Sequence, residues 1–281
     1  MNSNNINEIN KLFNLGLKNI RKNISLYSEA ITKQIKEFIE KNLNAIVPFL
    51  NYINGIYREL PEKLKIIIKN LAYRGWYISI EMDLPELTLL SEFITNKKYD
   101  KLDNYMCNII ESKLDQIEKE IIQKYPNRRK IIQSAFNAHK KGEYELSVPV
   151  FLAQADGICN ELLEMSLYKK YTPKKKEDPN QKMRLLTANE IEKYVSNSII
   201  MSALVEPLRN ISGLNVSTEY KNQYPIILNR HEIIHGLDLN YGNKKNSLKT
   251  ITLLHYFISV VYAAVKVNTK NKLTTKKNGI I

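Results

Sequence analysis

One segment near the C-terminal end of the chain carries chemically active residue types in two overlapping patterns. It reads Asn229-Arg230-His231-Glu232-Ile233-Ile234-His235-Gly236. From His231 it matches H-E-x-x-H, the spacing that places two imidazoles and a carboxylate around a zinc ion. From Arg230 it matches R-x-x-x-x-H, which supplies a guanidinium for phosphate oxygens and an imidazole for proton transfer. The histidines therefore either hold a metal ion or move protons on RNA.

The zinc interpretation needs a third ligand and a general base. His255 lies 20 residues beyond His235 and is the candidate ligand, while Glu232 would activate a metal-bound water. The longer H-x-x-G-x-x-H version of the motif is absent, because Tyr241 stands where its third histidine would be. Zinc peptidases of this type also set the motif helix beside a β-sheet, and His255 falls within a strongly apolar segment. Metal-free chemistry is favoured.

Composition points to an anionic partner in a reducing compartment. The chain has 281 residues, a formal net charge of +13 and 43% hydrophobic residues, so it can bury a sizeable core. The positive charge favours a polyanion such as RNA, although it also reflects a general abundance of lysine. Cys107 and Cys159 form no C-x-x-C, and residues 1–22 are too polar for a secretory signal. We expect a cytoplasmic protein.

The segment Thr250–Val265 has no charged residue and is the one candidate for a membrane helix. It is shorter than the roughly 20 residues that a spanning helix requires, and it contains His255, Ser259 and two tyrosines. We therefore predict a buried helix and no membrane partner.

The pattern of apolar residues predicts an all-α fold. Glycine and proline are scarce, at 9 each, and apolar residues recur at steps of three and four, as in Leu64, Ile67, Ile68 and Leu71. Residues 77–82 form the best strand candidate, and it is short. Pro48, Pro61 and Pro85 mark expected helix boundaries. Three parts are predicted: a helical region of unknown role (1–122), a helical domain (123–267) and a basic, disordered tail (268–281).

Within residues 123–267, breaks between apolar stretches predict the order of the helices. Lys141 and Gly142 separate the first two helices into a hairpin, and Pro149 would delay or kink the second. The predicted elements are a helix over 128–140, a helix over 143–162, a loop over 168–184, a helix over 187–208, a motif helix that follows Pro225 and ends at Gly236, and a last helix from Asn246-Ser247 to Val265.

This order of elements, with R-x-x-x-x-H at the end of a helix and an apolar helix after it, resembles the HEPN superfamily. The stretches Tyr144–Ile158 and Asn229–Lys249 are also similar to a group of uncharacterised bacterial proteins with the same C-terminal signature. The resemblance covers about residues 126–266. It implies an antiparallel helical bundle, and many members of this superfamily are metal-independent ribonucleases.

The resemblance also implies roles for the motif residues. Two protomers would join their motifs across a dimer interface. His235 would act as general acid or base toward the ribose 2′-hydroxyl, Arg230 would bind the scissile phosphate, and His231 would orient groups or move a second proton. The product would be a 2′,3′-cyclic phosphate, with no metal or cofactor. Such domains commonly serve as toxins or phage-defence effectors, so a regulatory or antitoxin partner is expected.

Other residues are candidates for RNA contact or for support of the motif. The loop after Gly236 offers side chains for phosphates and bases, namely Asn240, Tyr241, Lys244 and Lys245. Asp156 either orients a motif residue or caps a turn, and we favour the first. Trp76 is expected in the core rather than stacked on a base, and His139 is expected at the surface. A module that binds RNA or dimerises without catalysis remains the alternative to an enzyme.

Overall fold

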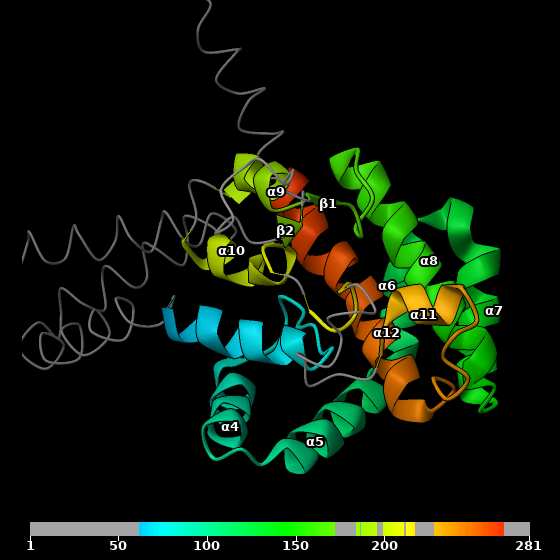
Figure 1. Cartoon of the computed structure of the whole chain (residues 1–281), viewed down its shortest axis with the longest axis horizontal. Coiled ribbons are helices and arrows are strands. Elements are labelled where there is room, and N and C mark those ends of the chain that lie inside the picture. Colours follow the sequence, from blue (N-terminus) through cyan, green and yellow to red (C-terminus); the bar gives the residue numbers. More distant parts are fainter. Residues whose placement is uncertain are drawn as a thin grey trace, which may run out of the picture.

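The computed structural model describes residues 62–171, 184–185, 187–195, 199–210, 212–216 and 228–266. Helices dominate these residues, which confirms the prediction of an all-α fold (Figure 1). The strands within them are two antiparallel pieces of two residues each, β1 (Lys170–Tyr171) and β2 (Arg184–Leu185). The predictions for residues 1–61, including the boundaries at Pro48 and Pro61, and for the basic tail lie outside the described residues.

The first helix within the described residues covers 62–73, as its apolar spacing predicts. The α-helices after it are α4 (Leu84–Thr95), α5 (Tyr99–Ser112), α6 (Leu114–Lys124), α7 (Arg129–Lys140), α8 (Tyr144–Leu163), α9 (Thr187–Val195), α10 (Ile199–Leu204), α11 (Arg230–Ile234) and α12 (Lys244–Tyr256). The 3₁₀ turns η1 (Pro126–Arg128) and η2 (Glu206–Leu208) adjoin helices, and a π-helical stretch, η4 (Phe257–Val261), continues α12.

Proline marks the start of α4, as predicted. Pro85 lies in the first turn, where a missing N–H costs no helical hydrogen bond. Asp83 completes a capping box: its carboxylate accepts from the Glu86 amide at 2.8 Å, and the Glu86 carboxylate accepts from the Asp83 amide at 3.0 Å. The chain therefore enters α4 with its first amides paired.

The predicted hairpin is formed by α7 and α8, which pack along each other. Gly142 turns the chain between them with a φ of +80°, a conformation that favours glycine. The rings of Phe136 and Phe151 meet edge to face at 5.0 Å between the two helices. Pro149 lies inside α8, in its second turn, so the helix starts before the proline rather than after it.

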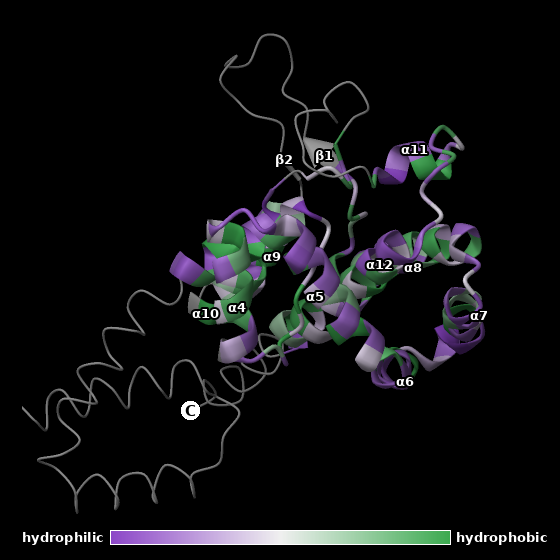
Figure 2. Ribbon diagram, turned by 90° about the horizontal axis from the view of Figure 1, so that it is seen from below, coloured by the Kyte–Doolittle hydropathy of each residue, from purple (hydrophilic) through white to green (hydrophobic). Residues whose placement is uncertain are grey.

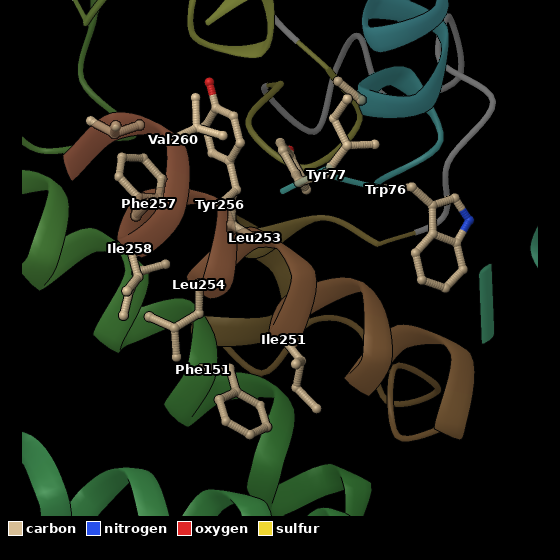
Figure 3. Close-up of a cluster of buried hydrophobic side chains, with 14 of the residues drawn as sticks. Trp76, Tyr77, Phe151, Ile251, Leu253, Leu254, Tyr256, Phe257, Ile258 and Val260 are labelled. Atoms are coloured by element: carbon tan, nitrogen blue, oxygen red, sulfur yellow. The ribbon is translucent and has the colours of Figure 1, made fainter. Parts of the chain in front are cut away.

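The apolar helix α12 crosses the middle of the molecule, where it packs along α8 and also contacts α5. Figure 3 shows Ile251 and Leu254 on the side of α12 that faces Phe151, with Trp76 and Tyr77 on the other side. Among the described residues, only the continuous helix Lys244–Lys266 is long and apolar enough to cross a membrane, and 83% of its apolar window is buried within the protein. Such burial is typical of a core helix.

One hydrophobic core includes side chains from both sides of the predicted boundary at residue 122. Trp76 and Leu102 belong to it together with Phe151 and Leu254. Trp76 is fully buried, and its Nε1 donates a hydrogen bond of 2.8 Å to Asp103. The prediction that Trp76 is a core residue is confirmed.

Three predicted elements differ from the structure. Residues 77–82 form no strand, because the Tyr77 amide donates to the Thr252 hydroxyl at 3.3 Å instead of to a neighbouring strand. Where one helix is predicted over 187–208, the described residues form α9, α10 and the 3₁₀ turn η2. The last helix begins two residues before the predicted cap at Asn246, because the Asn243 side chain accepts from the Asn246 amide at 2.9 Å.

Candidate functional site

The motif lies on the short helix α11, whose start is fixed by Asn229. The Asn229 side chain is buried, and its oxygen accepts a hydrogen bond of 3.2 Å from the Glu232 amide. Its amide nitrogen donates to the carbonyls of Gly213 at 3.1 Å and Val216 at 3.0 Å. A separate segment of the chain thus fixes the N-cap of the motif helix.

The sequence predicts a motif helix after Pro225, and α11 is this helix. Leu228 and Asn229 are not helical, and the helix begins at Arg230. The Arg230 amide donates to the Leu214 carbonyl at 2.9 Å, outside the helical pattern. The motif is therefore carried by little more than one helical turn, held by contacts with residues 213–216.

Gly236 ends α11, as predicted. Its φ is +70°, its amide donates to the Ile233 carbonyl at 3.2 Å, and the Leu237 amide donates to the Glu232 carbonyl at 2.8 Å. These two hydrogen bonds make a Schellman motif, in which glycine supplies the left-handed residue. His235 is the C-cap and is exposed.

The two motif histidines lie together, and Arg230 contacts a different partner. The rings of His231 and His235 are 4.4 Å apart at an interplanar angle of 58°, as expected for residues four apart on a helix. Both side chains are exposed. The Arg230 guanidinium instead lies over the ring of Tyr168, 4.6 Å from its centroid. The two imidazoles are thus open to solvent, while the guanidinium is held by an aromatic face.

Tyr168 is a site residue that the sequence analysis did not identify, and Asp156 holds the turn that carries it. The Asp156 carboxylate accepts from the Ser166 hydroxyl at 2.9 Å and from the Leu167 amide at 2.7 Å. The structure thus shows Asp156 in the second of its two predicted roles, the cap of a turn, and these two hydrogen bonds go to the turn rather than to a motif residue. Tyr168 follows directly after this turn, and its ring is the one over which Arg230 lies. Burial raises the pKa of the Tyr168 hydroxyl well above 10, so the ring stays neutral.

The predicted RNA-binding residues follow α11 and are engaged within the protein. The Tyr241 hydroxyl donates to the Glu145 carbonyl at 2.9 Å, and the backbone N–H of Asn240 donates to the Asp238 carboxylate at 2.8 Å. Lys244 forms an ion pair with Glu111 of α5. Lys245 forms one with Asp103 of the same helix, at 2.8 Å. Both lysines are about half exposed.

The zinc alternative lacks its third ligand. His255 is buried in α12, where its Nε2 lies 2.9 Å from a carboxylate oxygen of Glu120 on α6. Within the described ranges, no group of three His, Cys, Asp or Glu side chains is placed to hold a metal ion. The structure brings His231 and His235 together without His255.

His139 is buried rather than exposed, which corrects the prediction for this residue. Its Nδ1 lies 2.7 Å from the Ser247 hydroxyl, and that hydroxyl lies 2.8 Å from the hydroxyl of Ser147. The three side chains join α7, α8 and α12 in the core. Burial lowers the pKa of His139 below its usual 6.5, so the imidazole is neutral at neutral pH.

Large apolar side chains are exposed around the end of α11. They are Leu146 at 61%, Ile234 at 42%, Leu237 at 64% and Leu239 at 83% exposed. Figure 2 shows α11 at the periphery of the molecule, with apolar residues on it and on the loop that follows. The hydrogen bond from Tyr241 to Glu145 brings this loop beside Leu146.

Comparison of the chain with protein-family models, with curated proteins and with solved structures gives no match.

Proposed function

We propose that this protein is a metal-independent endoribonuclease of HEPN type, which acts in the cytoplasm as a homodimer. The observation that carries the proposal is the arrangement of α11. Two exposed imidazoles stand side by side at 4.4 Å, and the arginine of the same motif is fixed over Tyr168. Imidazoles that can accept and donate protons, together with a permanent cation, suit metal-free phosphodiester cleavage.

In the proposed reaction, the ribose 2′-hydroxyl oxygen attacks the adjacent phosphorus and loses its proton to the neutral imidazole of His235. Arg230 stabilises the negative charge that develops on the phosphate oxygens. The 5′-oxygen leaves and takes a proton from a protonated imidazole. The products are a 2′,3′-cyclic phosphate and a free 5′-hydroxyl, so atoms and protons balance without a metal ion.

A dimer follows from the geometry of this reaction. The entering and leaving oxygens stand on opposite sides of the phosphorus, but His231 and His235 of one chain share one face of one short helix. A second copy would supply the imidazole on the opposite side. The exposed Ile234, Leu237 and Leu239 beside the motif offer the apolar surface that such an interface needs.

The role of such an enzyme would be to arrest growth by cutting RNA, as a toxin or a phage-defence effector with a regulatory or antitoxin partner. The activity is tested with total RNA and purified protein in the presence of EDTA. We expect cleavage that leaves 2′,3′-cyclic ends and is lost in both Arg230→Ala and His235→Ala. Lys130→Ala is the matched control, because it removes an exposed cation on α7, a helix that does not carry the motif.

Intact RNA with the wild-type protein would overturn the nuclease assignment and leave the alternative of a binding module. Cleavage that needs a divalent metal ion and survives in both motif variants would also overturn it.

A further inference from the structure

Helix α5 presents a row of polar residues to the start of α12. Asp103, Cys107 and Glu111 are spaced by four residues, so they share one face of α5. From this face Asp103 pairs with Lys245, and Glu111 pairs with Lys244. Both acidic partners lie more than 130 residues from their lysines in sequence, so only the folded chain brings the charges together.

The first of these carboxylates is firmly placed. Asp103 accepts a hydrogen bond of 2.8 Å from the buried Trp76 indole as well as from Lys245. Burial acts to raise the pKa of the Asp103 carboxyl, but the bonds from Lys245 and Trp76 and the charge of Lys249 outweigh it and lower the pKa. Asp103 is therefore a fixed negative charge at the end of the loop that leaves the motif.

We propose that Asp103 and Glu111 act as internal substitutes for RNA phosphates, which occupy Lys244 and Lys245 until RNA displaces them. This inference rests on the proposed function, because it concerns access of RNA to the same site. A carboxylate and a phosphate present similar oxygen acceptors to an ammonium group. The occupant of the lysines in the free protein is thus α5, and the competing ligand is single-stranded RNA.

The two ion pairs between α5 and the lysines are weak enough for RNA to compete with them. The Lys244 and Glu111 side chains are 51% and 32% exposed, and those of Lys245 and Asp103 are 46% and 18% exposed. Ion pairs open to solvent are weak and are screened by salt. A polyanion that meets both lysines at once can therefore replace the carboxylates without unfolding α5 or α12.

The test removes both negative charges and keeps the hydrogen-bonding shapes, in the double variant Asp103→Asn with Glu111→Gln. The asparagine oxygen can still accept from Trp76. The matched control is Asp115→Asn with Glu118→Gln, because these two carboxylates of α6 pair with Lys140 at 2.7 and 2.9 Å. Both variants raise the net charge equally, and thermal melting of each checks that the fold is kept.

Binding is measured by fluorescence anisotropy with a labelled single-stranded RNA carrying 2′-O-methyl groups, which cannot be cleaved through the 2′-hydroxyl. We expect the α5 double variant to bind on the order of 5- to 10-fold more tightly than the wild type, and the α6 control to bind as the wild type does. Adding Lys244→Ala and Lys245→Ala to the α5 variant should abolish the gain.

Equal gains in the α5 and α6 variants would show a general charge effect and overturn the competition. No gain in the α5 variant, with its melting temperature kept, would also overturn it. Cleavage of ordinary RNA is scored separately. A binding gain without cleavage supports the proposed competition between the carboxylates and RNA and overturns the proposed nuclease activity. Cleavage without a binding gain overturns the proposed competition for the lysines and supports the nuclease.

Discussion

The Tyr241 hydroxyl donates a hydrogen bond of 2.9 Å to the Glu145 carbonyl, which is the carbonyl that Pro149 leaves without its helical partner. In a regular helix the amide of residue 149 would donate to the carbonyl of residue 145, but proline has no N–H. A side chain from the loop after the motif takes the place of that amide. The proline in α8 therefore frees a carbonyl that the tyrosine after α11 uses, and this hydrogen bond connects the motif loop to the hairpin.

Removal of this hydroxyl should destabilise the protein only where the proline is present. We expect Tyr241→Phe to lower the free energy of unfolding by about 0.5–1.5 kcal/mol, the usual net value of such a hydrogen bond. In a Pro149→Ala background the new amide can pair with Glu145, and the same change should cost clearly less. Urea unfolding of the four proteins in this double-mutant cycle measures the coupling. Equal costs in both backgrounds would refute the link.

Tyr168 should matter to activity through its ring and not through its hydroxyl. Tyr168→Phe keeps the face on which the Arg230 guanidinium lies, whereas Tyr168→Leu keeps an apolar side chain and loses the aromatic face. We expect RNA cleavage to be near normal in the phenylalanine variant and reduced roughly 10-fold or more in the leucine variant, since misplacement of a phosphate-binding group is costly. The rates are measured under single-turnover conditions.

A general packing role for Tyr168 predicts a different result. It would lower the melting temperature of the leucine variant and leave its cleavage rate per folded molecule unchanged. Arg230→Ala provides the second comparison. If Tyr168 acts by placing Arg230, the leucine change should have little further effect on the rate once Arg230 has been removed.

The parts of the fold that could be predicted from the sequence depend on local physics. Gly142 and Gly236 end their helices because a left-handed residue is needed there, and a glycine at such a position is visible in the sequence. The apolar runs of α7, α8 and α12 predict that these helices bury one face or more. The proximity of His231 and His235 follows in the same way from a spacing of four.

The features that the sequence does not reveal are contacts between distant segments. His139 precedes Lys140 and Lys141 at a helix end and looks exposed, but Ser247, 108 residues later, gives its ring a buried partner. Lys244 and Lys245 look available for RNA, and no local pattern indicates that α5 supplies their counter-charges. Tyr168 lies at the start of a polar stretch without periodicity. Its contact with Arg230 depends on how the hairpin and α11 pack.

The buried cluster of His139, Ser247 and Ser147 predicts a loss of stability in acid. Burial lowers the pKa of the folded-state imidazole below 6.5, with Lys244 and Lys140 acting in the same direction and Glu111 against it. The unfolded chain therefore binds a proton more readily than the folded one. The contribution of His139 is complete above about pH 6.5 and is lost as the pH falls through the folded-state pKa.

His139→Gln keeps a polar side chain at this position and removes the titration. We expect the free energy of unfolding of this variant, measured in urea between pH 5 and 8, to fall less steeply in acid than that of the wild type. His231→Gln makes the same change at an exposed histidine and is the control, measured over the same pH range. Parallel slopes for wild type and His139→Gln would contradict the assignment.

Lys249 is a buried cation whose replacement should stabilise the protein. The residue is 8% exposed, its Nζ lies 5.4 Å from the centroid of the Trp76 ring, and burial lowers its pKa from 10.5 to about 8. Because the folded-state pKa is depressed, the unfolded chain binds more protons between these two values, so wild-type stability should rise with pH across that interval.

Lys249→Met keeps the length of the side chain without the charge, and we expect it to raise the free energy of unfolding at pH 7 by about 1–3 kcal/mol. The gain should shrink toward pH 10, where the wild-type lysine is neutral when folded. Lys245→Met is the comparison, because the hydrogen bond to Asp103 raises the pKa of Lys245, and this variant should show no gain. A Lys249→Met protein less stable than the wild type in urea at pH 7 would show that the charge is needed by the fold.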